Sequence, residues 1–164
     1  MDASVRYTVF SPGYADQVFD LILAIQRDEF GIAITREAQP DLARIPENYQ
    51  HGSGNFWLAL EEDAVVGTIA LLDIGDSQVA LRKMFVRADY RGRGVAQALL
   101  QLALGWAGER GVGDVFLGTT AQFLAAQRFY EKNGFAAIAK AELPTRFPVM
   151  TVDTVFYRRR IRAE

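Results

Sequence analysis

The chain carries the stretch RGRGVA at positions 91–96, between an apolar run over 79–86 and a run over 95–106 whose apolar residues recur at helical spacing. This order predicts a strand that enters a helix through a basic, glycine-rich turn. Glycine lets the backbone approach a ligand closely, and the amides that open a helix attract anions. We therefore expect the turn to bind a phosphate group, with Arg91 and Arg93 adding positive charge.

The alternative for this turn is a glycine loop between strand and helix with two solvated arginines. Gln97 stands where the dinucleotide-binding pattern G-x-G-x-x-G needs its third glycine, and no G-x-x-x-x-G-K-[ST] phosphate loop occurs in the sequence. Neither of the two common nucleotide-binding folds is therefore supported.

The composition predicts one globular domain over residues 1–164. Half of the residues are hydrophobic and 12% are aromatic, which suits a single packed core. The net charge of -2 argues against a nucleic-acid partner. The sequence has no cysteine and one histidine, His51, so it offers no disulfide and no cysteine nucleophile, and we expect no metal site.

The sequence also shows no sign of a membrane segment. Residues 1–10 lack a basic region followed by an apolar core, and no uninterrupted apolar run is long enough to span a bilayer. We therefore expect no membrane partner and a soluble protein in the cytoplasm.

The apolar patterns along the chain predict a mixed sheet. Strands are expected over 5–9, 55–61, 65–73, 79–86, 114–120, 135–141 and 152–158, and helices over 14–30, 41–50, 95–106 and from 123 to a C-terminal cap at 133–134. Consecutive strands favour antiparallel pairing in the middle, whereas the two strand-helix-strand stretches require parallel or crossover pairing. The expected fold is α/β (α+β), with a mixed, mostly antiparallel central sheet of six to seven strands and about four flanking helices.

Two motifs together make the chain resemble the GCN5-related N-acetyltransferase (GNAT) superfamily. The coenzyme A motif of that family is a strand followed by [Q/R]-x-x-G-x-[G/A], and Arg91, Gly94 and Ala96 occupy those positions. A second motif, frequent as A-x-x-[LF]-Y-x-K-x-G-F, is matched by AQRFYEKNGF at 126–135. The resemblance covers about residues 56–135 and implies one GNAT-like domain.

The resemblance implies acetyl-CoA as co-substrate. It places the pyrophosphate on the backbone amides of the turn, and the pantetheine arm along the preceding strand, which splays from its neighbour and leaves backbone groups for the arm to pair with. A backbone amide near Phe85 or Val86 would hold the thioester oxygen. The coenzyme-binding residues implied in this way are Met84, Phe85, Val86, Arg91, Gly92, Arg93, Gly94, Val95 and Ala96.

By the same resemblance Tyr130 is the catalytic residue. A phenol with a pKa near ~10 can protonate a departing thiolate whose pKa lies near ~8.5. The alternative for Tyr130 is a core aromatic on the inner face of its helix.

The general base departs from the family pattern. Members that acetylate lysine often place a glutamate four residues before the position of Met84, and this chain has Ala80 there. Another carboxylate must then accept the proton of the amine. Asp28 and Glu29, at the end of the first expected helix, are candidates by their expected proximity alone.

Two further positions leave alternatives open. Phe123 stands where relatives often have an asparagine that binds the pantetheine, and Thr119 and Thr120 are both candidates to replace it. Arg82 and Lys83 are expected on opposite faces of their strand. One of them contacts the acceptor or the coenzyme, or else pairs with a buried carboxylate.

The resemblance implies an N-acetyltransferase that moves the acetyl group of acetyl-CoA to a primary amine of a small molecule or peptide. The amine attacks directly in a ternary complex, because a route through acetyl-cysteine is excluded by the composition. The alternative is a coenzyme A-binding sensor or partner protein of the same fold with little or no catalysis, for which Ala80 is the main argument. The sequence fixes neither the acceptor nor the oligomeric state, although exposed apolar residues are compatible with a homodimer.

Overall fold

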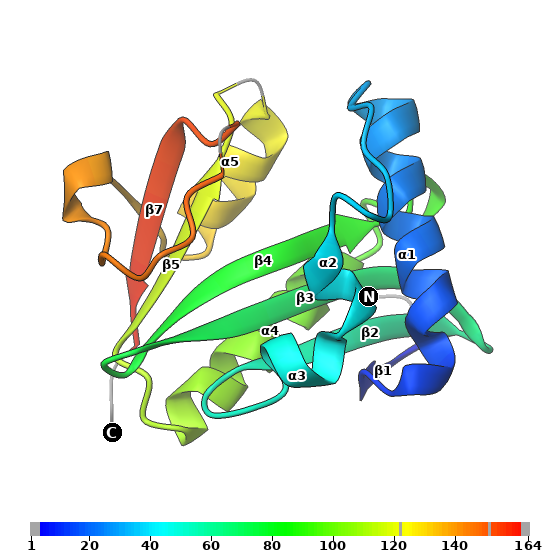
Figure 1. The fold of residues 1–164 in the computed structure, drawn as a ribbon, viewed down its shortest axis with the longest axis horizontal. Coiled ribbons are helices and arrows are strands. Elements are labelled where there is room, and N and C mark those ends of the chain that lie inside the picture. Colours follow the sequence, from blue (N-terminus) through cyan, green and yellow to red (C-terminus); the bar gives the residue numbers. More distant parts are fainter. Residues whose placement is uncertain (1–3, 122, 151, 162–164) are drawn as a thin grey trace.

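A computed structural model describes residues 4–121, 123–150 and 152–161. Its seven strands form one sheet in the order β1-β2-β3-β4-β5-β7-β6 (Figure 1). The strands are β1 (Val5–Val9), β2 (Asn55–Glu61), β3 (Ala64–Gly75), β4 (Gln78–Val86), β5 (Asp114–Thr119), β6 (Ala136–Ile138) and β7 (Val155–Arg160). The helices are α1 (Ala15–Ala24), α2 (Pro40–Ala43), α3 (Ile45–Tyr49), α4 (Val95–Glu109) and α5 (Leu124–Lys132).

The pairing is mixed and mostly antiparallel, as the sequence predicts. Strands β1 to β4 are antiparallel neighbours, β4 and β5 form the parallel pair, and β7 lies antiparallel between β5 and β6. The strand-helix-strand stretch that contains α5 is therefore a crossover, because β7 occupies the place beside β5.

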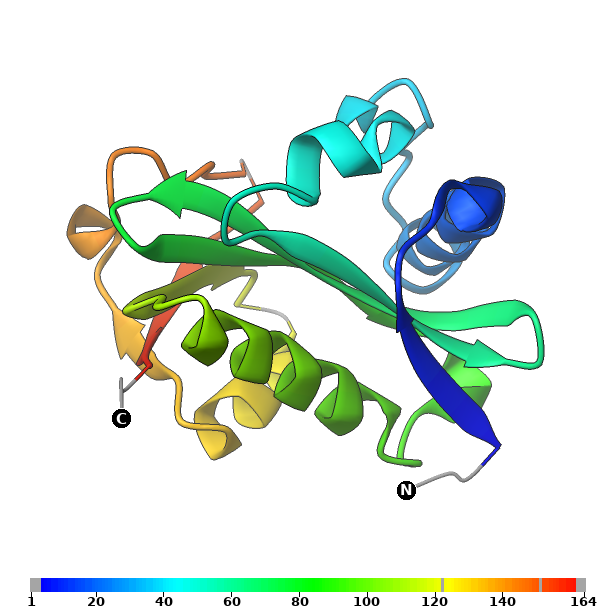
Figure 2. The same cartoon turned by 90° about the horizontal axis from the view of Figure 1, so that it is seen from below.

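Helices cover both faces of the sheet. Helices α1, α2 and α3 lie on one face, and α4 and α5 lie on the other (Figure 2). Because successive side chains of a strand point to opposite faces, β2 contributes to two cores. Phe56 and Leu58 pack in the core beneath α1 to α3, whereas Trp57 and Ala59 pack with the residues of α4.

The ends of several elements differ from the sequence prediction for local reasons. The first helix has nearly its predicted extent, but it is α-helical only to Ala24 and continues as a π-helix over Ile25–Glu29. Strand β6 is shorter than expected, because the Glu142 carboxylate accepts the amide of Ala139 at 2.8 Å and a 3-10 turn over Lys140–Glu142 follows. Strand β7 begins three residues late, after a turn in which the Asp153 amide donates to the Met150 carbonyl at 3.0 Å.

Strand β4 carries a bulge at Lys83. The register changes from Ala70↔Arg82 to Thr68↔Phe85, so β4 contains one extra residue, and Lys83 has a φ of 57°. The bulge interrupts the alternation of side chains. Arg82 Nη1 lies 3.9 Å and Lys83 Nζ 3.2 Å from Asp41 Oδ2. The two side chains therefore lie on the same side of the strand, and the prediction that they lie on opposite faces is wrong.

Strands β4 and β5 separate soon after they begin. Their ladder ends at Ala80↔Phe116, although β4 continues to Val86 and β5 to Thr119. Figure 1 shows the two strands diverging toward the end at which α5 lies. The splay expected at this strand is confirmed, and it leaves two backbone edges facing an opening.

Asp41 is the counter-ion of a half-buried cluster, and its removal is expected to destabilise the fold. Its carboxylate also accepts the Tyr49 hydroxyl at 2.6 Å, and the Lys83 side chain is only 8% exposed. Asp41→Asn leaves Lys83 without a charge partner, so we expect the free energy of unfolding in urea to fall by about 3 kcal/mol. The same change in a Lys83→Met background should cost much less, and equal losses would contradict the pairing.

The cluster also predicts how stability depends on pH. Burial alone would raise the pKa of Asp41, but the Lys83 charge, the Tyr49 hydroxyl and the Arg82 charge lower it overall. A carboxylate whose pKa is lower in the folded chain stabilises the fold above its unfolded pKa of ~3.9, and this stabilisation is lost as the pH falls through the folded value. Asp41→Asn should therefore flatten the acid side of the stability profile measured by urea unfolding.

Candidate active site

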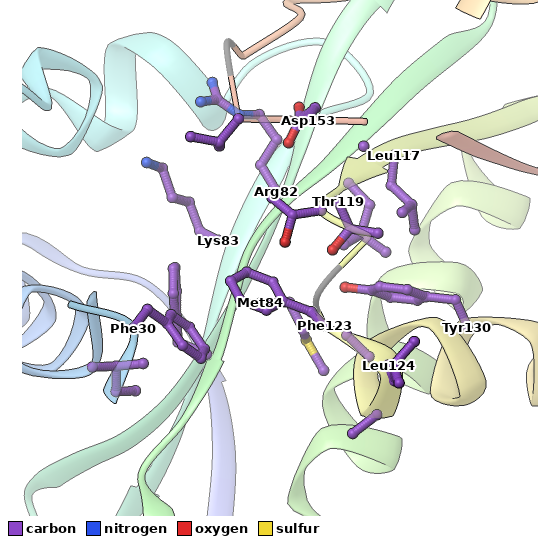
Figure 3. Close-up of a pocket in the computed structure, with 18 of the residues that line it drawn as sticks. Phe30, Arg82, Lys83, Met84, Leu117, Thr119, Phe123, Leu124, Tyr130 and Asp153 are labelled. Carbon is purple, nitrogen blue, oxygen red and sulfur yellow. The ribbon is translucent and has the colours of Figure 1, made fainter. Parts of the chain in front are cut away.

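The opening between β4 and β5 is a cavity of about 620 Å³ (Figure 3). It is lined by residues 81–85 of β4, residues 117–120 at the end of β5, and residues 124–126 of α5. The volume is within the ~300–1,000 Å³ that small-molecule pockets usually have. Because unpaired backbone groups run along both strands, the cavity suits an extended ligand that carries amides.

Tyr130 of α5 lines this cavity. Figure 3 shows its hydroxyl pointing into the cavity beside Thr119. The residue is 7% exposed, its ring packs near those of Phe135 and Tyr157, and no described residue hydrogen-bonds the hydroxyl. Burial raises the pKa of Tyr130 above its ordinary value. The phenol is therefore protonated at neutral pH and available as a proton donor.

Phe123 stands where relatives often have an asparagine, and Thr120 is one of the two candidates to replace that side chain. The buried Thr120 hydroxyl has no hydrogen-bond partner among the described residues, and Thr120 lines the cavity. The ring of Phe123 stacks on that of Phe30, with centroids 4.5 Å apart. Of the two threonine candidates, Thr120 thus carries the unsatisfied hydroxyl, and Phe123 forms an apolar wall.

The glycine turn has the conformation that its sequence predicts. Gly92 and Gly94 have φ values of 74° and 83°, in the left-handed region that favours glycine. Gly94 is the N-cap of α4 and no side chain caps the helix, so its first amides are left for a ligand. A recess of about 220 Å³ lies there, lined by Val86, Tyr90, Phe129 and residues 91, 92 and 94–97.

The two arginines of the turn have roles that the sequence does not reveal. Arg91 Nε donates to the Val86 carbonyl at 2.8 Å, and its guanidinium pairs with Glu29. The Arg93 guanidinium lies 4.3 Å from the centre of the Tyr90 ring and donates to the Asp89 carbonyl. Both side chains therefore brace the turn, and no described side chain caps the first backbone amides of α4.

The carboxylates predicted from proximity do not reach the cavity. Glu29 is engaged by Arg91, and Asp28 is exposed on a separate recess. Among the described residues, Asp153 is the carboxylate that lines the cavity. Asp153 was missed because it lies in the irregular segment before β7, where neither a motif nor a periodic pattern marks it.

A sequence model described as the acetyltransferase (GNAT) family matches residues 19–135. The chain belongs to the acetyltransferase (GNAT) family. The resemblance inferred from the glycine turn and from the motif at 126–135 is thereby confirmed.

The curated relatives that the chain matches are named N-acetylaspartate synthetase or N-acetyltransferase. The N-acetylaspartate synthetase of Xenopus tropicalis is 38% identical over 104 residues, which are 62% of this chain and 38% of that protein. N-acetyltransferase family 8 member 2 of Rattus norvegicus is 35% identical over 102 residues, which are 59% of this chain and 45% of that protein. The match thus spans less than half the length of either relative.

Solved GNAT structures share the fold over nearly the whole chain. An acetyltransferase of the GNAT family from Staphylococcus aureus Mu50 has a TM-score of 0.92 and 36% identity, and the match covers 96% of this chain and 99% of that one. The N-acetylglutamate synthase of Neisseria gonorrhoeae, solved with coenzyme A and N-acetyl-glutamate, has a TM-score of 0.75 at 17% identity over 99% of this chain and 36% of that one. The second likeness shows the fold alone, and together they confirm the predicted GNAT fold.

The described residues form neither a membrane-spanning helix nor a metal-binding cluster. Over 4–121, 123–150 and 152–161, no helix combines the length and the apolar character that a membrane crossing needs. The same residues hold no group of three or more His, Cys, Asp or Glu arranged to bind a metal ion. The cytoplasmic location and the homodimer stay predictions.

Gly94→Ala tests the turn as a coenzyme A site. A residue with a Cβ at a φ of 83° costs ~1–2 kcal/mol, so the turn should change conformation and the dissociation constant for coenzyme A should rise about tenfold. The matched control is Gly105→Ala within α4, where a Cβ meets no atom within 4 Å and alanine favours the helix. Equal affinity of both variants in isothermal titration calorimetry would contradict the assignment.

Proposed function

We propose that this GNAT domain transfers the acetyl group of acetyl-CoA to a primary amine by direct attack in a ternary complex. The observation that carries the proposal is the cavity between β4 and β5, which has free backbone edges on two sides. The Tyr130 hydroxyl lies within the cavity, and the uncapped start of α4 lies nearby. The names of the curated relatives, N-acetylaspartate synthetase and N-acetyltransferase family 8 member 2, support the same reaction class.

Acetyl-CoA, the co-substrate, fits the residues around this cavity. The positive φ values of Gly92 and Gly94 and the uncapped amides of α4 suit its pyrophosphate, on the backbone of residues 91–96. Met84 and Phe85 would pair with the pantetheine arm, whereas the Val86 carbonyl is already bound by Arg91. The unsatisfied hydroxyl of Thr120 is a further partner for the arm.

Tyr130 would act as the general acid in this reaction. Its buried hydroxyl is protonated at neutral pH and has no described partner to compete with a leaving thiolate. Donation of that proton as the carbon-sulfur bond breaks prevents the build-up of a buried thiolate charge. A coenzyme A-binding protein without catalysis remains the alternative, because Ala80 holds no carboxylate at the usual position of the base.

Tyr130→Phe is expected to lower kcat by roughly 10²-fold or more while leaving the affinity for coenzyme A unchanged. The assay is the release of free thiol from acetyl-CoA with a broad panel of primary amines. The matched control is Tyr7→Phe, which removes another buried hydroxyl without a hydrogen-bond partner, from β1, and should leave turnover unchanged.

Unchanged turnover in Tyr130→Phe would remove its role as the acid. Coenzyme A binding without amine-dependent thiol release from any member of the panel would favour the sensor over the enzyme.

A further inference from the structure

A second recess of about 210 Å³ adjoins the cavity. Arg82, Lys83, Phe123 and Asp153 line both, so they mark the boundary between them. Apolar residues from the segments after the π-helix and before β7 also line the recess. They are Ile32, Phe147, Pro148 and Met150, together with Phe30 and Val152, which the recess shares with the cavity. The volume of the recess is smaller than the ~300–1,000 Å³ that ligand pockets usually have. The small volume favours a small acceptor over a polypeptide segment.

We propose that this recess binds an amino acid with an apolar side chain, whose carboxylate pairs with Arg82 and whose amine gives its proton to Asp153. The proposal rests on the acetyl transfer proposed above and names the class of its acceptor and its general base.

The charges at the boundary favour an acceptor that carries a carboxylate. The Asp41 carboxylate pairs with Lys83 Nζ at 3.2 Å and accepts a hydrogen bond from the Tyr49 hydroxyl at 2.6 Å. The Arg82 guanidinium is 19% exposed, stands 3.9 Å from that carboxylate and otherwise contacts the sulfur of Met150 at 3.7 Å. No described carboxylate thus lies within hydrogen-bonding distance of Arg82, whose planar fork is suited to bind one.

A simple monoamine fits this site poorly. Its ammonium group would lie beside Asp153, but the monoamine brings no carboxylate for the Arg82 guanidinium, which has no described carboxylate within hydrogen-bonding distance. An amino acid brings a carboxylate for Arg82 together with the amine, and its apolar side chain meets the aromatic wall formed by the stacked rings of Phe30 and Phe123.

Asp153 lies where the acceptor and the thioester would meet. It packs against β5 so closely that a Cβ on Gly118 would come 2.6 Å from its Oδ2, so the glycine makes room for the carboxylate. The Met150 amide donates to it at 3.3 Å, and Arg82 and Lys83 are the charged groups that line the boundary beside it. Burial raises the pKa of Asp153, opposed by the Met150 amide and the Arg82 charge, which makes the carboxylate a better proton acceptor.

The reaction step balances with these two residues. The lone pair of the neutral amine attacks the thioester carbon, so a carbon-nitrogen bond forms and the carbon-sulfur bond breaks. Asp153 takes the proton that the nitrogen loses, and Tyr130 gives a proton to the departing thiolate. The products are an N-acetyl amino acid and free coenzyme A, and solvent returns the proton from Asp153 to the phenolate.

Direct binding tests the acceptor class without any turnover. With coenzyme A at saturation, calorimetry compares L-leucine, L-methionine and L-phenylalanine with isoamylamine, 3-(methylthio)propylamine and phenethylamine, the matching amines that lack the carboxylate. We expect at least one amino acid to bind ten or more times more tightly than its matching amine. Arg82→Gln should abolish that preference and leave coenzyme A binding intact, and Arg82→Lys should restore part of it.

Equal affinities within every pair, or no binding of the three amino acids, would overturn the proposal. Neither result bears on acetyl transfer itself, because the thiol-release assay with the broad amine panel tests that reaction separately.

Asp153→Asn tests the base. The variant should lower kcat with the preferred amino acid by roughly 10²-fold, and kcat/KM should lose the acid limb along which wild-type activity rises as Asp153 deprotonates. Asp28→Asn is the matched control, because Asp28 is exposed outside both recesses and should retain wild-type turnover. If the Asp153→Asn variant keeps both the acid limb and the wild-type kcat, Asp153 is excluded as the base.

Discussion

The early end of the pairing between β4 and β5 is the constraint on which the rest of the site depends. Antiparallel neighbours hold the outer edges of both strands, but the parallel ladder stops at Ala80↔Phe116. A ladder continued to Val86 would satisfy the backbone groups and fill the space. Because it stops, two backbone edges, the Tyr130 hydroxyl and the Asp153 carboxylate share one cavity. The chain keeps unpaired polar backbone in its interior, and this is stable only where water or a ligand satisfies it.

The bulge at Lys83 links this opening to the charge of the site. By adding one residue to β4, it turns Arg82 and Lys83 to the same side, toward Asp41 in α2. Lys83 pairs with Asp41 at 3.2 Å, whereas Arg82 stands 3.9 Å from the same carboxylate. Both cations line the boundary between the cavity and the recess, together with Asp153. A local backbone irregularity thus places two cations at the edge of an otherwise apolar pocket, where we propose that Arg82 binds a carboxylate.

The sequence predicts those parts that depend on local patterns. Strand β2 is predicted at its observed bounds because it is buried on both faces and therefore reads as an apolar run before a charged turn. The glycine turn is predicted because its positive φ values favour glycine. Tyr130, which lines the cavity, is singled out by a motif, and its catalytic role stays a prediction. Contacts between distant segments are not predictable in this way. No periodicity connects Arg91 with Glu29, which pair, or Asp153 with Gly118, which lie close together. Nor does any pattern in the sequence predict the positive φ of Lys83.

We infer that the gap between β4 and β5 holds the arm of the coenzyme. A crystal structure of the chain with coenzyme A tests this placement. We expect the pantetheine to lie between the two strands, with its amides hydrogen-bonded to the backbone near Met84 and Phe85, and the pyrophosphate to lie on the amides after Arg91. Coenzyme A bound elsewhere, or β4 and β5 paired through to Thr119 with the ligand present, would contradict it.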